Sequence, residues 1–244
     1  MPIISVFTFK ELFPIPEICE ILNGKKQSEV WLTAKESKYN KNEIFIQYWF
    51  YEDVEEGLKK IFSDEDADEI VSFLKQNGKS KVLKRIYCFI NTLTKTLEVY
   101  RGPDEKTEEI VALLEKLLKV KFVPLNLKSE ELQKIYSQHS VELKQVMFKN
   151  IEGLIFEILR GNYLENNSKF KEYLKKFPES LRVISFRPKI KFLNRGNKYQ
   201  VTINGDKGTI RFSSDEVFMW RPRFEIRQIV FIVATITGLL QTLK

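Results

Sequence analysis

The sequence contains few of the residues on which metal binding and nucleophilic catalysis depend. Its single histidine is His139, and its two cysteines, Cys19 and Cys88, lie far apart in the chain. One histidine excludes sites built from several histidines, and two isolated cysteines provide neither a disulfide framework nor a zinc knuckle. We therefore expect no metal or other cofactor, and the sparse cysteines favour a reducing cytoplasm.

Long apolar runs and leader sequences are also lacking. Residues 1–6 have neither the basic leader nor the small-residue cleavage site of a signal peptide. The longest uncharged run, residues 228–243, has 16 residues, fewer than the roughly 20 that a helix needs to cross a bilayer. We therefore expect a cytoplasmic protein that does not associate with membranes.

Motifs for catalysis are incomplete. Glu142 and Lys144 have the spacing of a metal-dependent nuclease strand, and Asp104 could be the upstream carboxylate. We predict a helix there, in which residues two apart point about 200° from each other and do not converge. No serine-hydrolase or dinucleotide-binding motif occurs either. The residues therefore argue against an enzyme, with a divergent nuclease left as a third alternative.

Positive charge is concentrated near the C-terminus. Residues 181–227 hold eleven Lys and Arg against four carboxylates, and this difference of +7 equals the net charge of the whole chain. A localised positive field attracts polyanions such as nucleic acids.

Strand-like and helix-like segments alternate over the first 140 residues. Apolar runs predict strands at 3–9, 30–33, 44–51, 82–91, 96–100 and 120–123. Residues 44–51 lack a helical period, so we interpret them as a buried strand. Helical periodicity and capping residues predict helices after Ser63, after 102–104 and at 130–138.

The longest periodic segment is residues 141–160. Its apolar residues recur at three- and four-residue spacing, and Gly161 follows. This pattern predicts a long central helix, followed by a shorter helix at 168–177 that ends at Pro178.

After Pro178 the apolar period changes to two. Residues 184–192, 198–203 and 209–212 predict a three-stranded antiparallel meander, and 204–208 provide hairpin-turn chemistry. We expect Tyr199 beside Phe192 and Phe212 on the buried face. On the outer face we expect Thr202 between Lys189 and Thr209.

That outer face is predicted to be basic and to lack carboxylates. Neighbours on one face of a strand are about 6.6 Å apart, a spacing that suits phosphate tracking. A solvated face on which lysines discourage aggregation is the other interpretation. The predicted nucleic-acid-binding residues are Arg187, Lys189, Lys191, Arg195, Lys198, Arg211, Arg221, Arg223 and Arg227.

A closing helix from about residue 224 is apolar on nearly all sides. Such a helix must be enclosed by its own fold or by a second subunit. If a homodimer forms through it, the predicted interface residues are Ile229, Ile232, Ile236 and Leu240.

The sequence thus predicts an α+β fold with a mixed N-terminal lobe (1–140) and a C-terminal lobe (141–244). One continuous body is the alternative. The C-terminal lobe would contain the long helix, the basic meander and the closing helix. We expect a non-enzymatic nucleic-acid-binding protein with little sequence preference, DNA ahead of RNA. The alternative is an assembly module that binds an acidic protein partner.

Overall fold

The computed structural model describes residues 3–23, 26–27, 29–38, 40–59, 62–189, 199–214 and 223–237. The chain divides into two compact units. The main unit comprises Met1–Leu12 and Phe89–Lys244, and the inserted unit comprises Phe13–Cys88. The boundary expected between residues 140 and 141 lies inside the main unit.

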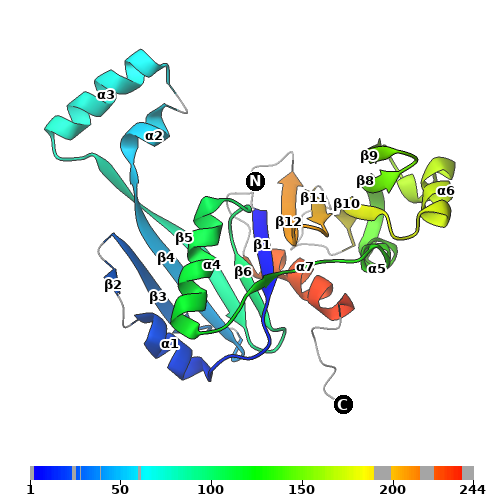
Figure 1. Cartoon of the computed structure of the whole chain (residues 1–244), viewed down its shortest axis with the longest axis horizontal. Coiled ribbons are helices and arrows are strands. Elements are labelled where there is room, and N and C mark those ends of the chain that lie inside the picture. Colours follow the sequence, from blue (N-terminus) through cyan, green and yellow to red (C-terminus); the bar gives the residue numbers. More distant parts are fainter. Residues whose placement is uncertain are drawn as a thin grey trace. The chain divides into compact units, whose positions relative to one another are not determined.

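An antiparallel sheet forms the main unit (Figure 1). Its strands follow the order β6-β1-β12-β11-β10-β8-β9, and β7 also pairs with β1. The strands are β1 (Ile3–Thr8), β6 (Thr96–Val99), β7 (Val123–Pro124), β8 (Ser140–Ile151), β9 (Leu154–Arg160), β10 (Leu181–Pro188), β11 (Tyr199–Asn204) and β12 (Thr209–Ser214). The helices are α4 (Glu105–Leu118), α5 (Ser129–His139), α6 (Ser168–Lys176) and α7 (Arg223–Ile236), with a 3-10 turn at Leu164–Asn166.

The prediction of a long helix over residues 141–160 was wrong. These residues form the β8–β9 hairpin, in which Ile151 pairs with Leu154. The two residues between them, Glu152 and Gly153, both have positive φ, as a tight hairpin turn requires. The apolar residues also satisfied helical spacing, but many of them are β-branched or aromatic, which favours strands.

The predicted meander exists, as the middle of a larger sheet. The fold class was therefore wrong in making it an isolated three-stranded sheet, because β8 pairs with β10 and β1 pairs with β12. Its inner face is buried as expected, including Ile184, Tyr199 and Phe212. Val201 pairs with Phe212 and Phe186, so both registers differ from the expected ones by an even number of residues. Even shifts leave every side chain on its predicted face.

Helix α7 packs one side against this core. Ile229, Val230 and Val233 are buried, Ile232 and Ile236 are partly buried against the core, and Phe231 is exposed. Three of the four predicted dimer residues thus contact their own chain, while Leu240 lies outside the described residues. Within the described part of the chain, no helix has the length and apolarity needed to span a membrane.

The inserted unit combines an antiparallel sheet with three helices. Its strands are β2 (Lys26–Gln27), β3 (Val30–Glu36), β4 (Glu43–Asp53) and β5 (Lys81–Asn91), of which residues 89–91 belong to the main unit. Its helices are α1 (Ile15–Asn23), α2 (Val54–Leu58) and α3 (Asp64–Gln76). Ser63 caps α3 as predicted, because its hydroxyl accepts a hydrogen bond from the Asp66 N–H at 3.3 Å.

Candidate functional site

The sheet of the inserted unit has two chemically different faces. On one face, Leu32, Ile44, Ile46 and Tyr48 are buried, and α1 packs against β3 and β4. Helix α1 contributes its buried residues Ile18 and Leu22 to this core. Since side chains alternate along a strand, the intervening residues point to the opposite face.

That opposite face carries a row of aromatic rings. The β3–β4 register places Trp31 opposite Trp49, Thr33 opposite Gln47 and Lys35 opposite Phe45. Tyr51 follows Trp49 along β4, and Tyr87 is contributed by β5. We call this surface the aromatic face; it consists of Trp31, Phe45, Trp49, Tyr51 and Tyr87 with the cations Lys35 and Arg85.

The five rings form two contacting groups and remain accessible to solvent. The Trp31 and Trp49 rings are stacked, with centroids 6.0 Å apart and planes 8° from parallel. Tyr51 also lies 6.0 Å from Trp31, and Phe45 stacks on Tyr87 at 5.6 Å. Tyr51 is 45 % exposed, and the other four are partly exposed. A partly exposed row of ring surfaces is suited to contact flat aromatic ligands.

Two cations lie on these rings. The Arg85 guanidinium carbon is 5.4 Å from the Trp49 centroid and 5.0 Å from the Tyr87 centroid. The Lys35 ammonium is 5.5 Å from the Phe45 centroid. Among the residues that the structure describes, neither cation pairs with a carboxylate. Their positive charges therefore lie beside the rings, where they are available to a ligand bound on this face.

Two neutral polar side chains, Thr33 and Gln47, lie between the rings. Thr33 donates to Gln47 Oε1 at 3.2 Å, and the Trp49 indole N–H donates to the Thr33 hydroxyl at 3.3 Å. These contacts fix the orientation of the Trp49 ring. They also use the Thr33 hydroxyl and the Gln47 carbonyl oxygen, two groups that would otherwise be available to the edge of a ligand.

Sequence reasoning missed this face. Interpreting residues 44–51 as a buried strand was correct for the even-numbered residues, which are buried, and wrong for the odd-numbered ones, which are intermediate or exposed. Gln47 is the only polar residue in that run, so the alternation is hidden. The available signal lies in the neighbouring strands, where Thr33, Lys35 and Arg85 mark the accessible side.

The predicted basic residues do not form one described surface. Lys191, Arg195, Lys198 and Arg221 lie outside the described residues, and the side chain of Arg223, at the start of α7, is likewise not described. Arg187, Lys189 and Arg211 are exposed. In the observed register Thr202 lies between Ser185 and Arg211, and not between Lys189 and Thr209.

A carboxylate that was not expected accompanies the basic residues. Glu142 pairs with Arg187 across β8 and β10, and its oxygen lies 3.3 Å from the Arg187 guanidinium. Lys189 donates to the Gln138 carbonyl at 2.8 Å. Glu142 was missed because its segment was predicted to be helical. Of the three exposed cations, only Arg211 has no described polar partner.

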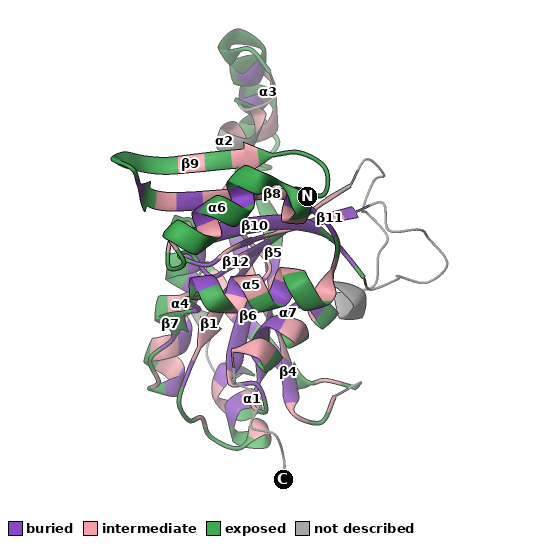
Figure 2. Ribbon diagram, turned by 90° about the vertical axis from the view of Figure 1, so that its right-hand side faces the viewer, coloured by how far each residue is buried: buried purple, intermediate pink, exposed green. Residues whose placement is uncertain are grey.

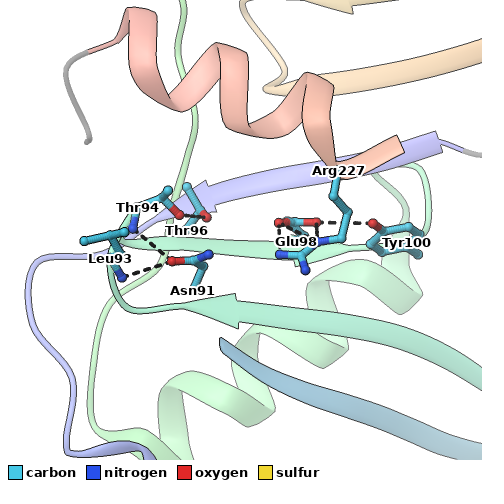
Figure 3. A network of polar contacts seen from close by, with 7 residues as sticks. All are labelled: Asn91, Leu93, Thr94, Thr96, Glu98, Tyr100 and Arg227. Atoms are coloured by element: carbon cyan, nitrogen blue, oxygen red, sulfur yellow. Dashed lines mark hydrogen bonds and ion pairs between the residues drawn. The ribbon is translucent and has the colours of Figure 1, made fainter. Parts of the chain in front are cut away.

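Arg227 lies in the core of the main unit (Figure 3). Its guanidinium donates to both carboxylate oxygens of Glu98, at 2.8 Å and 2.9 Å, and lies 4.3 Å from the centroid of the Phe89 ring. Tyr100 donates to the same carboxylate at 3.3 Å. The side chains of Arg227 and Glu98 are only 16 % and 2 % exposed. Arg227 therefore anchors α7 to β6, and its guanidinium faces this carboxylate.

The nuclease-like pair Glu142 and Lys144 does converge, contrary to the geometric argument from a helix. Because β8 is a strand, the Lys144 ammonium reaches Glu142 at 2.6 Å. The nearest partners of Glu142 are thus two cations, Lys144 and Arg187. In the described ranges, no group of three potential metal ligands gathers.

His139, which directly precedes the segment predicted as the long helix, is the last residue of α5. Burial, and secondarily the positive charge of Lys189, lower its pKa from the ordinary histidine value. The imidazole is therefore neutral at physiological pH and adds nothing to a phosphate-binding surface.

No protein-family model matches the sequence, and no curated protein matches it at a significant level.

Proposed function

We propose that the aromatic face binds single strands of nucleic acid with little sequence preference. The observation that supports this most is the position of Arg85 across Trp49 and Tyr87, on a sheet face lined by five partly exposed rings. Aromatic side chains on an open sheet stack with unpaired bases, and adjacent cations attract the phosphates.

The chemistry of the face favours unpaired bases over a duplex. In a duplex the base planes are stacked on one another, so rings on a flat sheet cannot reach them. Every base has a flat π surface, which makes stacking tolerant of sequence. Thr33 and Gln47 bond to each other, so base-edge reading is limited. We therefore expect similar affinity for different homopolymers.

We further propose that the basic residues of 181–227 form a second phosphate-binding surface. Arg187, Lys189 and Arg211 are its described members, and an acidic protein partner is the other ligand that they fit. We also propose that the protein binds DNA in preference to RNA and acts in the cytoplasm.

Binding is tested with the full chain and labelled oligo(dT), oligo(dA) and oligo(rU). Trp49→Ala should weaken binding by roughly five- to 150-fold, because one stacked base contributes about 1–3 kcal/mol. Trp49→Phe keeps a ring and should recover much of that loss. Fluorescence anisotropy measures the affinity, and circular dichroism verifies that the variants are folded.

The salt dependence of the affinity, measured in the same assay, tests the two cations separately from the rings. A single-stranded phosphate contact contributes about −0.7 to the slope of log affinity against log salt, so Lys35→Ala with Arg85→Ala should flatten it by about 1.4. The matched control is Phe73→Ala, which removes an exposed ring of α3 in the same unit. Equal losses from Phe73→Ala and Trp49→Ala would contradict the proposal. A loss of affinity seen only in the double variant Lys189→Ser with Arg211→Ser would indicate that the basic residues, and not the aromatic face, bind the nucleic acid.

A further inference from the structure

Strand β9 is an edge of the main unit's sheet with apolar side chains exposed on both faces. It pairs with β8 and ends the strand order, and Figure 2 colours it almost entirely as exposed. Leu154, Phe156 and Ile158 point to one face and are 48 %, 56 % and 37 % exposed. Ile155, on the other face, is 79 % exposed. Stable proteins usually protect such an edge with lysine, proline or a bulge.

The backbone of β9 presents a regular row of hydrogen-bonding groups at this edge. The Gly161 N–H donates to the Lys144 carbonyl at 3.0 Å, and the β8–β9 register runs without a gap from the Gln145–Arg160 pair to the Lys149–Phe156 pair. Since the amide groups of successive residues in a strand point to opposite sides, residues 157 and 159 also face β8. The N–H and C=O groups of residues 156, 158 and 160 therefore point outward.

The one acidic side chain in the middle of β9 is held by its own chain. Lys169 of α6 forms an ion pair with Glu157, and the Tyr173 hydroxyl donates to it at 3.0 Å. The hydrogen bond from Lys169 is the first cause of the lowered pKa of Glu157. This carboxylate is therefore bonded to α6 and does not present an unpaired charge that would oppose strand pairing at the edge.

We propose that β9 pairs with β9 of a second copy of this chain, antiparallel and centred on Phe156. In that register Phe156 lies opposite the partner's Phe156, and Leu154 lies opposite the partner's Ile158. All three exposed apolar side chains of one face thus meet apolar side chains. Ile155 lies opposite the partner's Glu157, so no like charges face each other.

The neighbouring registers are poorer. A pairing centred on Glu157 places two carboxylates directly opposite each other, which destabilises a sheet. A pairing centred on Ile155 places Ile158 opposite the partner's Glu152, in the turn that precedes the strand. Self-complementarity therefore selects a second copy as the occupant and Phe156 as the centre. This interface differs from the one predicted on α7, where Ile229 is buried within its own chain.

The register is tested by cysteine cross-linking in a Cys19→Ser background, since Cys88 is buried. Residues directly opposite in a hydrogen-bonded pair have Cα atoms about 5.5 Å apart, within disulfide range. Phe156→Cys should therefore form an interchain disulfide rapidly on mild oxidation. Glu157→Cys and Leu154→Cys should form it much more slowly. Faster cross-linking through Glu157→Cys than through Phe156→Cys would overturn the register.

Association itself is tested by sedimentation equilibrium of the unmodified chain and of Phe156→Lys. The unmodified chain should dimerise with increasing concentration. Phe156→Lys should lose the dimer without loss of thermal stability, because the Phe156 side chain is exposed in the monomer. Phe73→Lys, at another exposed phenylalanine, should leave the dimer intact. A concentration-independent monomer, or a dimer unaffected by Phe156→Lys, would overturn the proposal.

Discussion

Glu98→Ala is expected to destabilise the main unit by about 3–5 kcal/mol, because it removes the carboxylate paired with the Arg227 guanidinium, whose side chain is only 16 % exposed. The two Glu98 oxygens accept hydrogen bonds from Arg227 at 2.8 Å and 2.9 Å. Urea denaturation should show a lower midpoint with little change in slope.

A double-mutant cycle separates the interaction energy between Glu98 and Arg227 from the cost of burying either charge alone. Arg227→Met removes the charge and keeps an apolar side chain against the Phe89 ring, which Arg227 covers at 4.3 Å. Glu98→Ala with Arg227→Met should therefore be less destabilising than the sum of the two single changes. Hydrogen exchange should increase first in α7, which this pair holds to β6. A loss below about 1 kcal/mol for Glu98→Ala would show that the site is hydrated and that the pair behaves as a surface ion pair.

Local chemistry made several elements predictable from sequence. Ser63 begins α3 and Asp104 begins α4, because each side chain accepts a backbone N–H three residues ahead. The alternation in β11 and β12 correctly predicted that Tyr199, Val201, Ile203, Ile210 and Phe212 are buried, whereas in β10 the odd-numbered Val183 and Ser185 are buried as well. In these places the pattern depends on nearby residues alone.

The errors arose where distant residues decide the structure. Apolar residues between 141 and 160 fit both periods, and the positive φ of Glu152 and Gly153 turns the chain back on itself. This error hid the ion pair of Glu142 with Arg187, so the basic face was expected to be free of carboxylates. Register depends on loop geometry, which alternation does not encode.

The candidate site was missed for a related reason. The rings of the aromatic face come from three strands, and Trp31 meets Trp49 only through the β3–β4 register. A row of apolar residues is a core when a helix covers it and a binding surface when none does. The sequence of β4 is compatible with both, because α1 covers only the face with Ile44 and Ile46.

Gly208→Ala is expected to destabilise the main unit by roughly 3 kcal/mol or more, because it combines an unfavourable φ with a backbone clash. Gly208 has φ +58°, and an added Cβ would lie 2.4 Å from the Leu125 carbonyl oxygen and 2.9 Å from the Val6 carbonyl oxygen. Neither oxygen can move alone, since the Leu125 N–H donates to Val6 at 2.9 Å and the Val6 N–H donates to Gly208 at 2.8 Å.

Gly153→Ala measures the cost of the left-handed backbone conformation without a steric clash. Gly153 has φ +79°, but its added Cβ would meet nothing within 4 Å. This change should therefore cost only the left-handed conformation, about 1–2 kcal/mol. Chemical denaturation of both variants gives the difference, which measures how tightly the 123–127 segment closes over the β11–β12 turn. Equal losses in the two variants would mean that this segment moves away and that the close approach does not stabilise the fold.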